Sequence, residues 1–154
     1  MTKYPDKILV GALELCDIPE LGITDLQMRV DTGAATSSLH VDNIEEFVVE
    51  GKRRVRFDIH PDVHNVEKII TATAPLSGKK TVKSSSADKE KRVVIKTAIK
   101  LGGETWKIKL TLTDRSTMTN LMLLGREAMK DRILVDPSEE FILTKDNSTA
   151  FLDS

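Results

Sequence analysis

Strict alternation of apolar and polar residues is the feature that most constrains the fold of this chain. It runs through RRVRFDIH (53–60), RVVIKTAIKL (92–101) and TWKIKLTLTD (105–114). Successive side chains of a strand point to opposite faces, so each run predicts a strand with one face in the core and the other in solvent. Gly102 and Gly103 separate the last two runs. They predict a type I′ hairpin, because that turn needs positive φ at both central positions.

Shorter segments extend this pattern. KILVGAL (7–13) and EEFILT (139–144) are further strand candidates, and GREAMKD (125–131) predicts one short helix. Several short strands separated by turn signals predict an all-β sandwich or barrel. SGKKTVKSSSADKEKR (77–92) is polar and mixed in charge, so it predicts a solvated loop. Loops of this length often act as lids, and the part from Val82 to Arg92 would be the flap of a neighbouring site.

Length and charge narrow the class of protein. The chain has 154 residues, which predicts a single domain over 1–154. Its 23 basic and 24 acidic residues give a formal net charge of -1, which argues against a nucleic-acid platform or a membrane-surface binder. The only cysteine, Cys16, cannot form an internal disulfide, which favours a reducing compartment. The apolar run near the N-terminus is too short for a secretory signal or a spanning helix, so we expect a cytoplasmic protein.

The segment MRVDTGAATSSLH (28–40) places one carboxylate, Asp31, at the end of an apolar strand and before a glycine and several hydroxyl groups. An aspartate in this position can close a turn by bonding to its own backbone. It can instead be half of a catalytic pair, in which two carboxylates share one proton around a water molecule. The other aspartates lack this loop. A catalytic pair would therefore need a second copy of the chain, related by two-fold symmetry.

Four blocks in order carry a family resemblance: DTGAATSSLH (31–40), LTLTDRSTM (110–118), LLGREAM (123–129) and LVDPSEEF (134–141). With these blocks the chain resembles the retropepsin-like aspartic proteases, and most closely a bacterial branch often labelled putative ATP-dependent zinc protease. The resemblance implies a closed acid-protease β-barrel with one short helix. It also implies an association with ATP-grasp ligases that add glutamate to proteins.

The resemblance implies an aspartic peptidase that acts as a homodimer on a peptide or protein substrate. Asp31 from each chain would activate water for peptide hydrolysis. Thr32, Gly33, Ala34 and Ser37 would form the active-site loop. In that loop the glycine permits a tight turn, the threonine hydrogen-bonds across the two-fold axis, and Ser37 or Ser38 ties the loop to its own strands.

Three arginines, Arg29, Arg115 and Arg126, lie inside or beside these blocks. One interpretation is a structural ion pair, for instance with Asp114 or Glu127. The other is that they bind substrate by recognising an acidic group such as a glutamate-modified tail. The second interpretation suits the ligase association that the resemblance implies.

The residues that could bind zinc are Cys16, His40, His60 and His64, and their spacing matches no established zinc motif. Pro61 argues against a helix that would present His60 and His64 together. No phosphate-binding glycine loop occurs either, so we expect no cofactor, and ATP would act through a partner. Two further functions stay open. One is a non-catalytic retropepsin-fold binding module that works with an ATP-grasp protein-glutamate ligase, and the other is a zinc-dependent hydrolase, as the branch label says.

Overall fold

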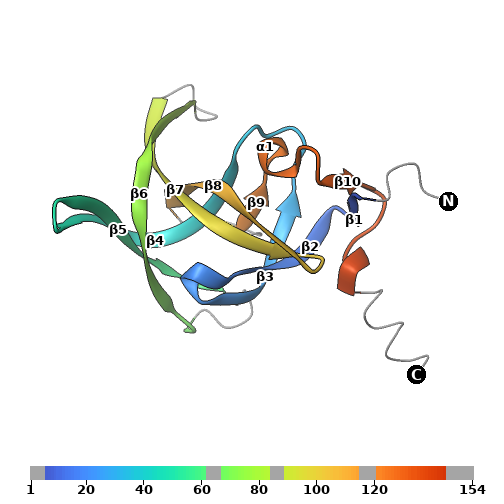
Figure 1. Ribbon diagram of the computed structural model, residues 1–154, viewed down its shortest axis with the longest axis horizontal. Coiled ribbons are helices and arrows are strands. Elements are labelled where there is room, and N and C mark those ends of the chain that lie inside the picture. The colour runs from blue at the N-terminus through green and yellow to red at the C-terminus, as the bar shows by residue number, and fades with distance from the viewer. Residues whose placement is uncertain (1–5, 62–66, 84–88, 115–120, 145–154) are drawn as a thin grey trace.

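The computed structural model describes residues 6–61, 67–83, 89–114 and 121–144, and Figure 1 shows how their elements are arranged. None of the helices among these residues has the length and apolar composition that crossing a bilayer requires. In chain order the elements are β1 (Ile8–Val10), β2 (Leu13–Ile18), the 3-10 helix η1 (Pro19–Leu21), β3 (Ile23–Val30), β4 (Ser37–Val49), β5 (Lys52–Ile59), β6 (Ile70–Lys83), β7 (Lys89–Leu101), β8 (Glu104–Asp114), β9 (Met122–Leu124), α1 (Arg126–Met129) and β10 (Ile133–Val135).

Eight strands form one ring-like sheet in the order β2-β3-β9-β4-β5-β6-β7-β8. Two additional pairings close the sheet on itself: β2, at one end of that order, pairs with β7, and β8, at the other end, pairs with β4. A separate parallel pair, β1 with β10, lies at one end of the molecule (Figure 1). This architecture confirms the predicted all-β barrel, because the strands form a ring and helices contribute only short segments.

The alternating runs supply the core, as their pattern predicts. In β5 the side chains of Val55, Phe57 and Ile59 are fully buried, while the charged residues between them face outward. The matching inward residues of β7 and β8 are Val93, Ile95, Thr97, Ile99, Leu101, Trp106, Ile108, Leu110 and Leu112. Removing this apolar surface from water stabilises the ring by roughly 25 cal/mol for each Å² buried.

The predicted hairpin between β7 and β8 is confirmed. Gly102 and Gly103 have φ values of 59° and 82°, and Leu101 pairs with Glu104 across the turn. Both φ values lie in the left-handed region, which glycine adopts at little cost because it has no Cβ. The two strands leave this turn in register, and β8 therefore places its inward face against the same core as β7.

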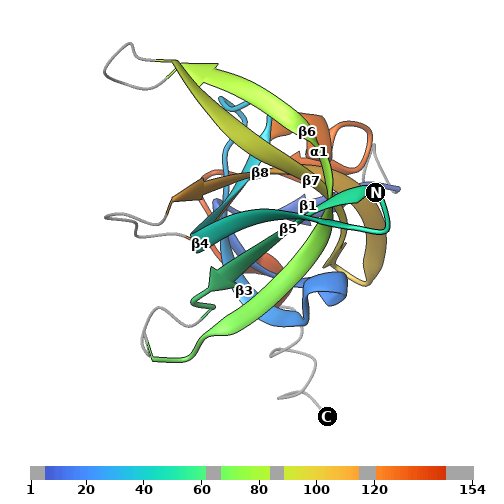
Figure 2. The same cartoon turned by 90° about the vertical axis from the view of Figure 1, so that its left-hand side faces the viewer.

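The loop predicted for 77–92 is corrected by the structure. β6 continues to Lys83 and β7 begins at Lys89, so paired strands occupy most of that segment (Figures 1 and 2). Past Pro75 β6 no longer pairs with β5. From there β6 and β7 continue together as a two-stranded ribbon. Because neither face of such a ribbon has to be apolar, polar side chains are suited to both faces. The sequence then lacks the apolar–polar alternation that marks a buried strand. Residues 84–88, part of the predicted flap, lie outside the described residues.

The strand predicted for 139–144 is also corrected. Residues 142–144 form a helical turn, and Phe141 before it has a φ of 54°. The reason is Glu14, a fully buried residue of β2. Its carboxylate accepts the backbone N–H of Ile142 at 2.9 Å and of Leu143 at 3.3 Å. Because it also accepts the N–H of Gly11 at 2.8 Å, one carboxylate holds both terminal segments of the described chain.

Candidate functional site

The loop that follows β3 is built around Asp31, which is half-buried. Its backbone N–H donates to the carbonyl oxygen of Leu124 at 2.9 Å, extending the parallel pairing of Val30 with Leu124. Its Oδ1 accepts the N–H of Gly33 at 3.0 Å, which is an Asx turn. Among the described residues, no hydrogen bond engages Oδ2. The carboxylate therefore shapes its own loop and keeps one oxygen available.

Close contact with the LLG segment fixes this loop. The N–H of Gly125 donates to Ser37 Oγ at 3.0 Å, and the N–H of Arg126 donates to the carbonyl oxygen of Ala34 at 2.8 Å. A Cβ at Gly125 would lie 2.5 Å from the carbonyl carbon of Thr36, so only glycine allows this approach. Segments about ninety residues apart in the sequence are thereby locked together.

Of the two predicted substrate-binding arginines that the structure describes, only Arg126 contacts the loop. Arg126 Nη1 donates to the carbonyl oxygens of Thr32 at 3.4 Å and Gly33 at 3.3 Å. Arg29 is exposed on β3, and no ion pair within the described part of the chain involves it. Arg115 lies outside the described residues. A role in binding substrate stays a prediction for all three.

A cavity of about 580 Å³ opens beside the loop. Its apolar lining comes from Met129 at the end of α1 and from Ile133, Leu134 and Val135 of β10. Thr32 and Arg126 form the side that faces the loop. Small-molecule and peptide sites are typically concave and apolar, with a few polar groups that orient the ligand. This cavity, which Thr32 lines directly after Asp31, is therefore a place close to the loop where a bound group could lie.

The residues considered for zinc lie apart. Cys16 is buried in the core with its thiol 3.8 Å from Met122 Sδ, and burial raises the pKa of this thiol to about 12. His40 is buried in β4, and His60 Nε2 lies 2.8 Å from Asp42 Oδ2. His60 therefore already has a carboxylate partner on β4. His64 lies outside the described residues, and no cluster of three His, Cys, Asp or Glu side chains occurs within them.

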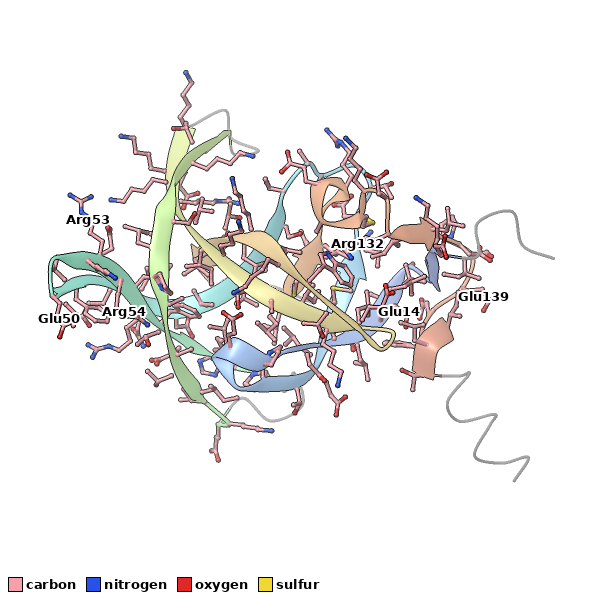
Figure 3. All side chains as sticks on the ribbon, in the orientation of Figure 1. Glu14, Glu50, Arg53, Arg54, Arg132 and Glu139 are labelled. Atoms are coloured by element: carbon pink, nitrogen blue, oxygen red, sulfur yellow. The ribbon has the colours of Figure 1, made fainter. Side chains whose placement is uncertain are left out.

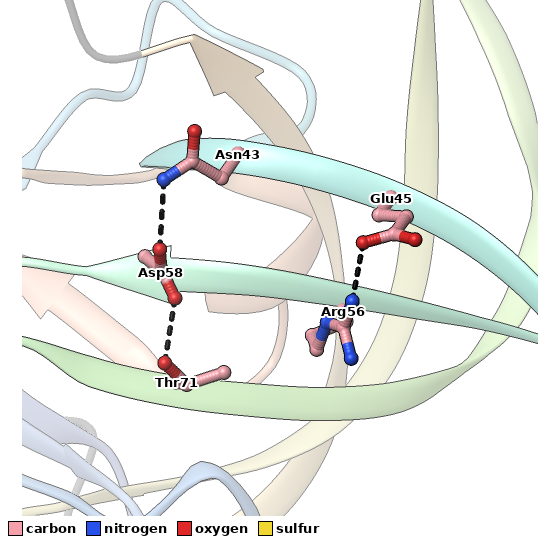
Figure 4. Close-up of polar contacts among 5 residues, drawn as sticks. All are labelled: Asn43, Glu45, Arg56, Asp58 and Thr71. Atoms are coloured by element: carbon pink, nitrogen blue, oxygen red, sulfur yellow. Dashed lines mark hydrogen bonds and ion pairs between the residues drawn. The ribbon is translucent and has the colours of Figure 1, made fainter.

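Polar side chains also bridge β4, β5 and β6 on their outer face, as Figure 4 shows. Asp58 accepts a hydrogen bond from Thr71 Oγ1 at 2.6 Å and another from Asn43 Nδ2 at 2.8 Å. These two bonds, in that order, hold the pKa of Asp58 below its usual value. Arg56 and Glu45 form an ion pair one step further along the strands. Since every group has a protein partner, this ladder has a structural explanation.

Figure 3 shows labelled charged side chains in two separate parts of the molecule. Glu50, Arg53 and Arg54 lie at the outer end of the β4–β5 hairpin, and Arg132 lies in the other half near α1. Arg132 belongs to a second cleft, which the sequence analysis did not identify. The only sequence signal for it is WKIK (106–109), where lysines alternate with buried residues as on any solvent-facing strand.

Comparison with known proteins identifies a family and several relatives of this chain. Residues 9–146 match the family described as RimB-like, retropepsin-like aspartic endopeptidase RimB. A probable alpha-L-glutamate ligase of Shewanella halifaxensis is 44% identical over 142 residues, which are 92% of this chain and 31% of that protein. A protein of the same name from Desulfotalea psychrophila is 43% identical over 132 residues, 86% of this chain and 28% of that protein. The chain thus spans less than a third of the length of these curated relatives.

A solved structure shares the fold. A Legionella pneumophila protein of unknown function superposes with a TM-score of 0.74 and is 32% identical. The match covers 88% of this chain and 97% of that one. The barrel described above is therefore also found as a crystallised protein of similar extent.

The relatives correct the expectation of a homodimeric aspartic peptidase. Four curated proteins, 43–45% identical to this chain, are named probable alpha-L-glutamate ligases, and none of those names describes a peptidase. The geometry also gives Asp31 a structural use, since its Oδ1 closes the Asx turn. The peptidase prediction is therefore wrong: the blocks that predict the barrel do not carry the activity with them, because one fold serves many functions.

Proposed function

The chain belongs to the RimB-like family of retropepsin-like aspartic endopeptidases, and from this premise we propose that it is a non-catalytic binding module that works with an ATP-grasp protein-glutamate ligase. The barrel follows from the family, whereas activity depends on the site. In this proposal the ligase supplies the ATP chemistry, and this chain binds the ligase or the protein that the ligase modifies.

The observation that carries the proposal is the extent of the matches. Segments of 131–142 residues, which are 28–31% of proteins named as ligases, align with 85–92% of this chain. In those proteins a domain of this kind is therefore part of one polypeptide with the remaining two thirds. A domain joined to an enzyme is well placed to hold a substrate or to position the enzyme, because linkage raises its effective concentration.

The rigid loop and its neighbouring cavity support a binding role. Contacts of Gly125 and Arg126 fix the loop before any partner arrives. A preformed surface costs less ordering entropy on binding than a mobile one. The apolar cavity beside Thr32 provides a recess of about 580 Å³ for a side chain of a bound protein.

An assay in trans tests the proposal. The Shewanella halifaxensis relative would be prepared without the segment that matches this chain, and glutamate incorporation into an acceptor protein would be measured with and without added chain. We expect the added chain to raise the rate several-fold and to bind the shortened ligase in calorimetry. Absence of both binding and stimulation would contradict the proposal.

Asp31→Asn separates binding from hydrolysis. The amide oxygen can still accept the Gly33 N–H, so the loop should keep its shape, whereas an amide cannot act as a base. We expect this variant to stimulate the ligase as well as the parent does. Loss of stimulation in a variant with unchanged unfolding midpoint would show that Asp31 acts chemically, against a non-catalytic module.

A further inference from the structure

A second cleft, of about 340 Å³, lies between β8 and α1 and is strongly cationic. Five basic side chains and one acidic side chain line it, although the whole chain has a net charge of -1. Arg132 stacks on the ring of Trp106 with its guanidinium 5.0 Å from the ring centroid, and Trp106 Nε1 donates to the carbonyl oxygen of Ala128 at 3.0 Å. The indole therefore joins the two walls of the cleft. The basic residues are Lys96, Lys107, Lys109, Lys130 and Arg132, and the acidic one is Glu127.

Two of these lysines face each other at a cost to the fold. Lys96 of β7 and Lys109 of β8 are directly paired residues, and both are exposed. Like charges in directly opposed positions destabilise a sheet. Lys107 is paired with Glu20 at 2.6 Å, but no ion pair within the described residues neutralises Lys96, Lys109 or Lys130. An anion bound between them would remove the repulsion.

The cleft also contains an open strand edge. β8 pairs with β7 from Glu104 to Thr111, but its pairing with β4 begins only at Leu110. Among the described residues, the stretch from Glu104 to Lys109 thus has a strand partner on one side only. Unpaired N–H and C=O groups of such an edge can bond to an extended peptide, which adds as one more strand.

We propose that the cleft between β8 and α1 binds an extended, glutamate-rich peptide segment. Its backbone would pair with the edge of β8 at Trp106 to Lys109. Alternate side chains of an added strand lie on one face about 7 Å apart, which is also the spacing of Lys107 and Lys109. Carboxylates at alternate positions would therefore reach Lys109, Lys96 across the strand pair, and Lys107, which would give up its pairing with Glu20.

A peptide fits this cleft better than a nucleic acid does. Both are anionic, but only a peptide has backbone donors and acceptors that match a strand edge. The stacking that single-stranded nucleic acids need is blocked, since Trp106 is 8% exposed and Arg132 covers its ring. That the acid is glutamate rests on the proposed function, in which a glutamate ligase is the partner.

Trp106 allows a direct test, because it is the only tryptophan of the chain. Hexaglutamate would be titrated into the protein at 0.15 M salt, with intrinsic fluorescence and calorimetry as readouts and hexaglutamine as the uncharged control. We expect saturable binding of hexaglutamate that weakens as salt rises. The double variant Lys96→Gln, Lys109→Gln should raise Kd by about tenfold, because it removes two charge pairs.

A matched control isolates the local effect. Lys52→Gln with Lys68→Gln makes the same change in net charge at exposed positions outside the cleft, and should leave Kd within about twofold. The edge is tested with two peptides of equal charge, one of alternating Glu and Ala and the other of alternating Glu and Pro. Proline has no N–H, so the second peptide should bind several-fold more weakly.

The outcomes are distinct. Equal loss of affinity in both double variants, or tighter binding of hexauridylate than of hexaglutamate, would overturn the proposal. Absence of any hexaglutamate binding would also overturn it, yet would leave ligase stimulation in trans unaffected. Conversely, hexaglutamate binding with no effect on the ligase would contradict the proposed function and leave the acidic-peptide site standing.

Discussion

At the scale of single residues, Asp58 is a carboxylate outside the Asp31 loop whose hydrogen bonds contribute to the stability of the fold. The hydroxyl of Thr71 and the amide of Asn43 both donate to it and hold its pKa below the usual value. A lowered pKa in the folded state means that Asp58 stabilises the fold above its unfolded pKa. This contribution is lost as the pH falls through the folded pKa.

Thr71→Val tests this pH dependence. The variant removes the first donor, so the pKa of Asp58 should rise toward its ordinary value in an NMR titration of the carboxyl carbon. The difference in unfolding free energy between parent and variant should be largest at neutral pH and shrink in acid. Thr73→Val, two residues along the same strand, is the control and should leave the titration of Asp58 in place. An unchanged Asp58 pKa in Thr71→Val would refute the assignment.

At the scale of elements, the loop after β3 and the start of α1 depend on one glycine. A Cβ at Gly125 would meet Thr36 at 2.5 Å, although the backbone of Gly125 is extended with φ of -88°. The cost of Gly125→Ala is therefore a clash without backbone strain, and we expect a loss of about 2–3 kcal/mol in urea unfolding. Gly78→Ala is the matched control, because nothing lies within 4 Å of its Cβ position. Its unfolding free energy should stay within about 1 kcal/mol of the parent. Equal effects of the two would contradict the clash.

The same elements show what the sequence can and cannot predict. The alternation in β5, β7 and β8 and the Gly102–Gly103 turn are local signals, so these strands and their hairpin were predictable. The parallel pairing of β3 with β9 is not local, since it joins residues more than ninety positions apart. The helical turn at 142–144 forms because Glu14, far away in sequence, accepts its N–H groups.

The two candidate sites also differ in how far the sequence can predict them. DTGA and LLG are contiguous motifs, so the sequence could indicate that Asp31 and Gly125 belong to one site. The cleft of Lys96 and Trp106 depends on where the pairing of β8 with β4 begins. Nothing in the alternation of β8 reveals that limit, because paired and unpaired edges carry the same period of two.

At the scale of the whole molecule, the reactivity of the Cys16 thiol reports on whether the ring of strands is closed. It lies in β2 next to Asp17, which pairs with Lys100 of β7. With the thiol 2% exposed and its pKa raised to about 12 by burial, the reactive thiolate is scarce in the folded state. We expect labelling by a thiol reagent at pH 8 to be roughly a thousandfold slower than in urea. A Ser77→Cys, Cys16→Ala variant, with its thiol at an exposed position, should react at once. Rapid labelling of the parent would mean that the β2–β7 junction opens readily.

Glu14 accepts hydrogen bonds from the N–H groups of Gly11 and Ile142. These bonds hold the first and last described segments at the same end of the barrel, opposite the β4–β5 hairpin (Figure 1). A second domain tethered to either of these described segments would leave the barrel from that one end, and a short flexible tether would hold it at about millimolar local concentration. Contacts with a dissociation constant near millimolar would then be half occupied. A freestanding chain has no tether and meets its partner only at cellular concentration. To achieve the same occupancy it must bind that partner about a thousandfold more tightly if the partner is micromolar, a difference of about 4 kcal/mol.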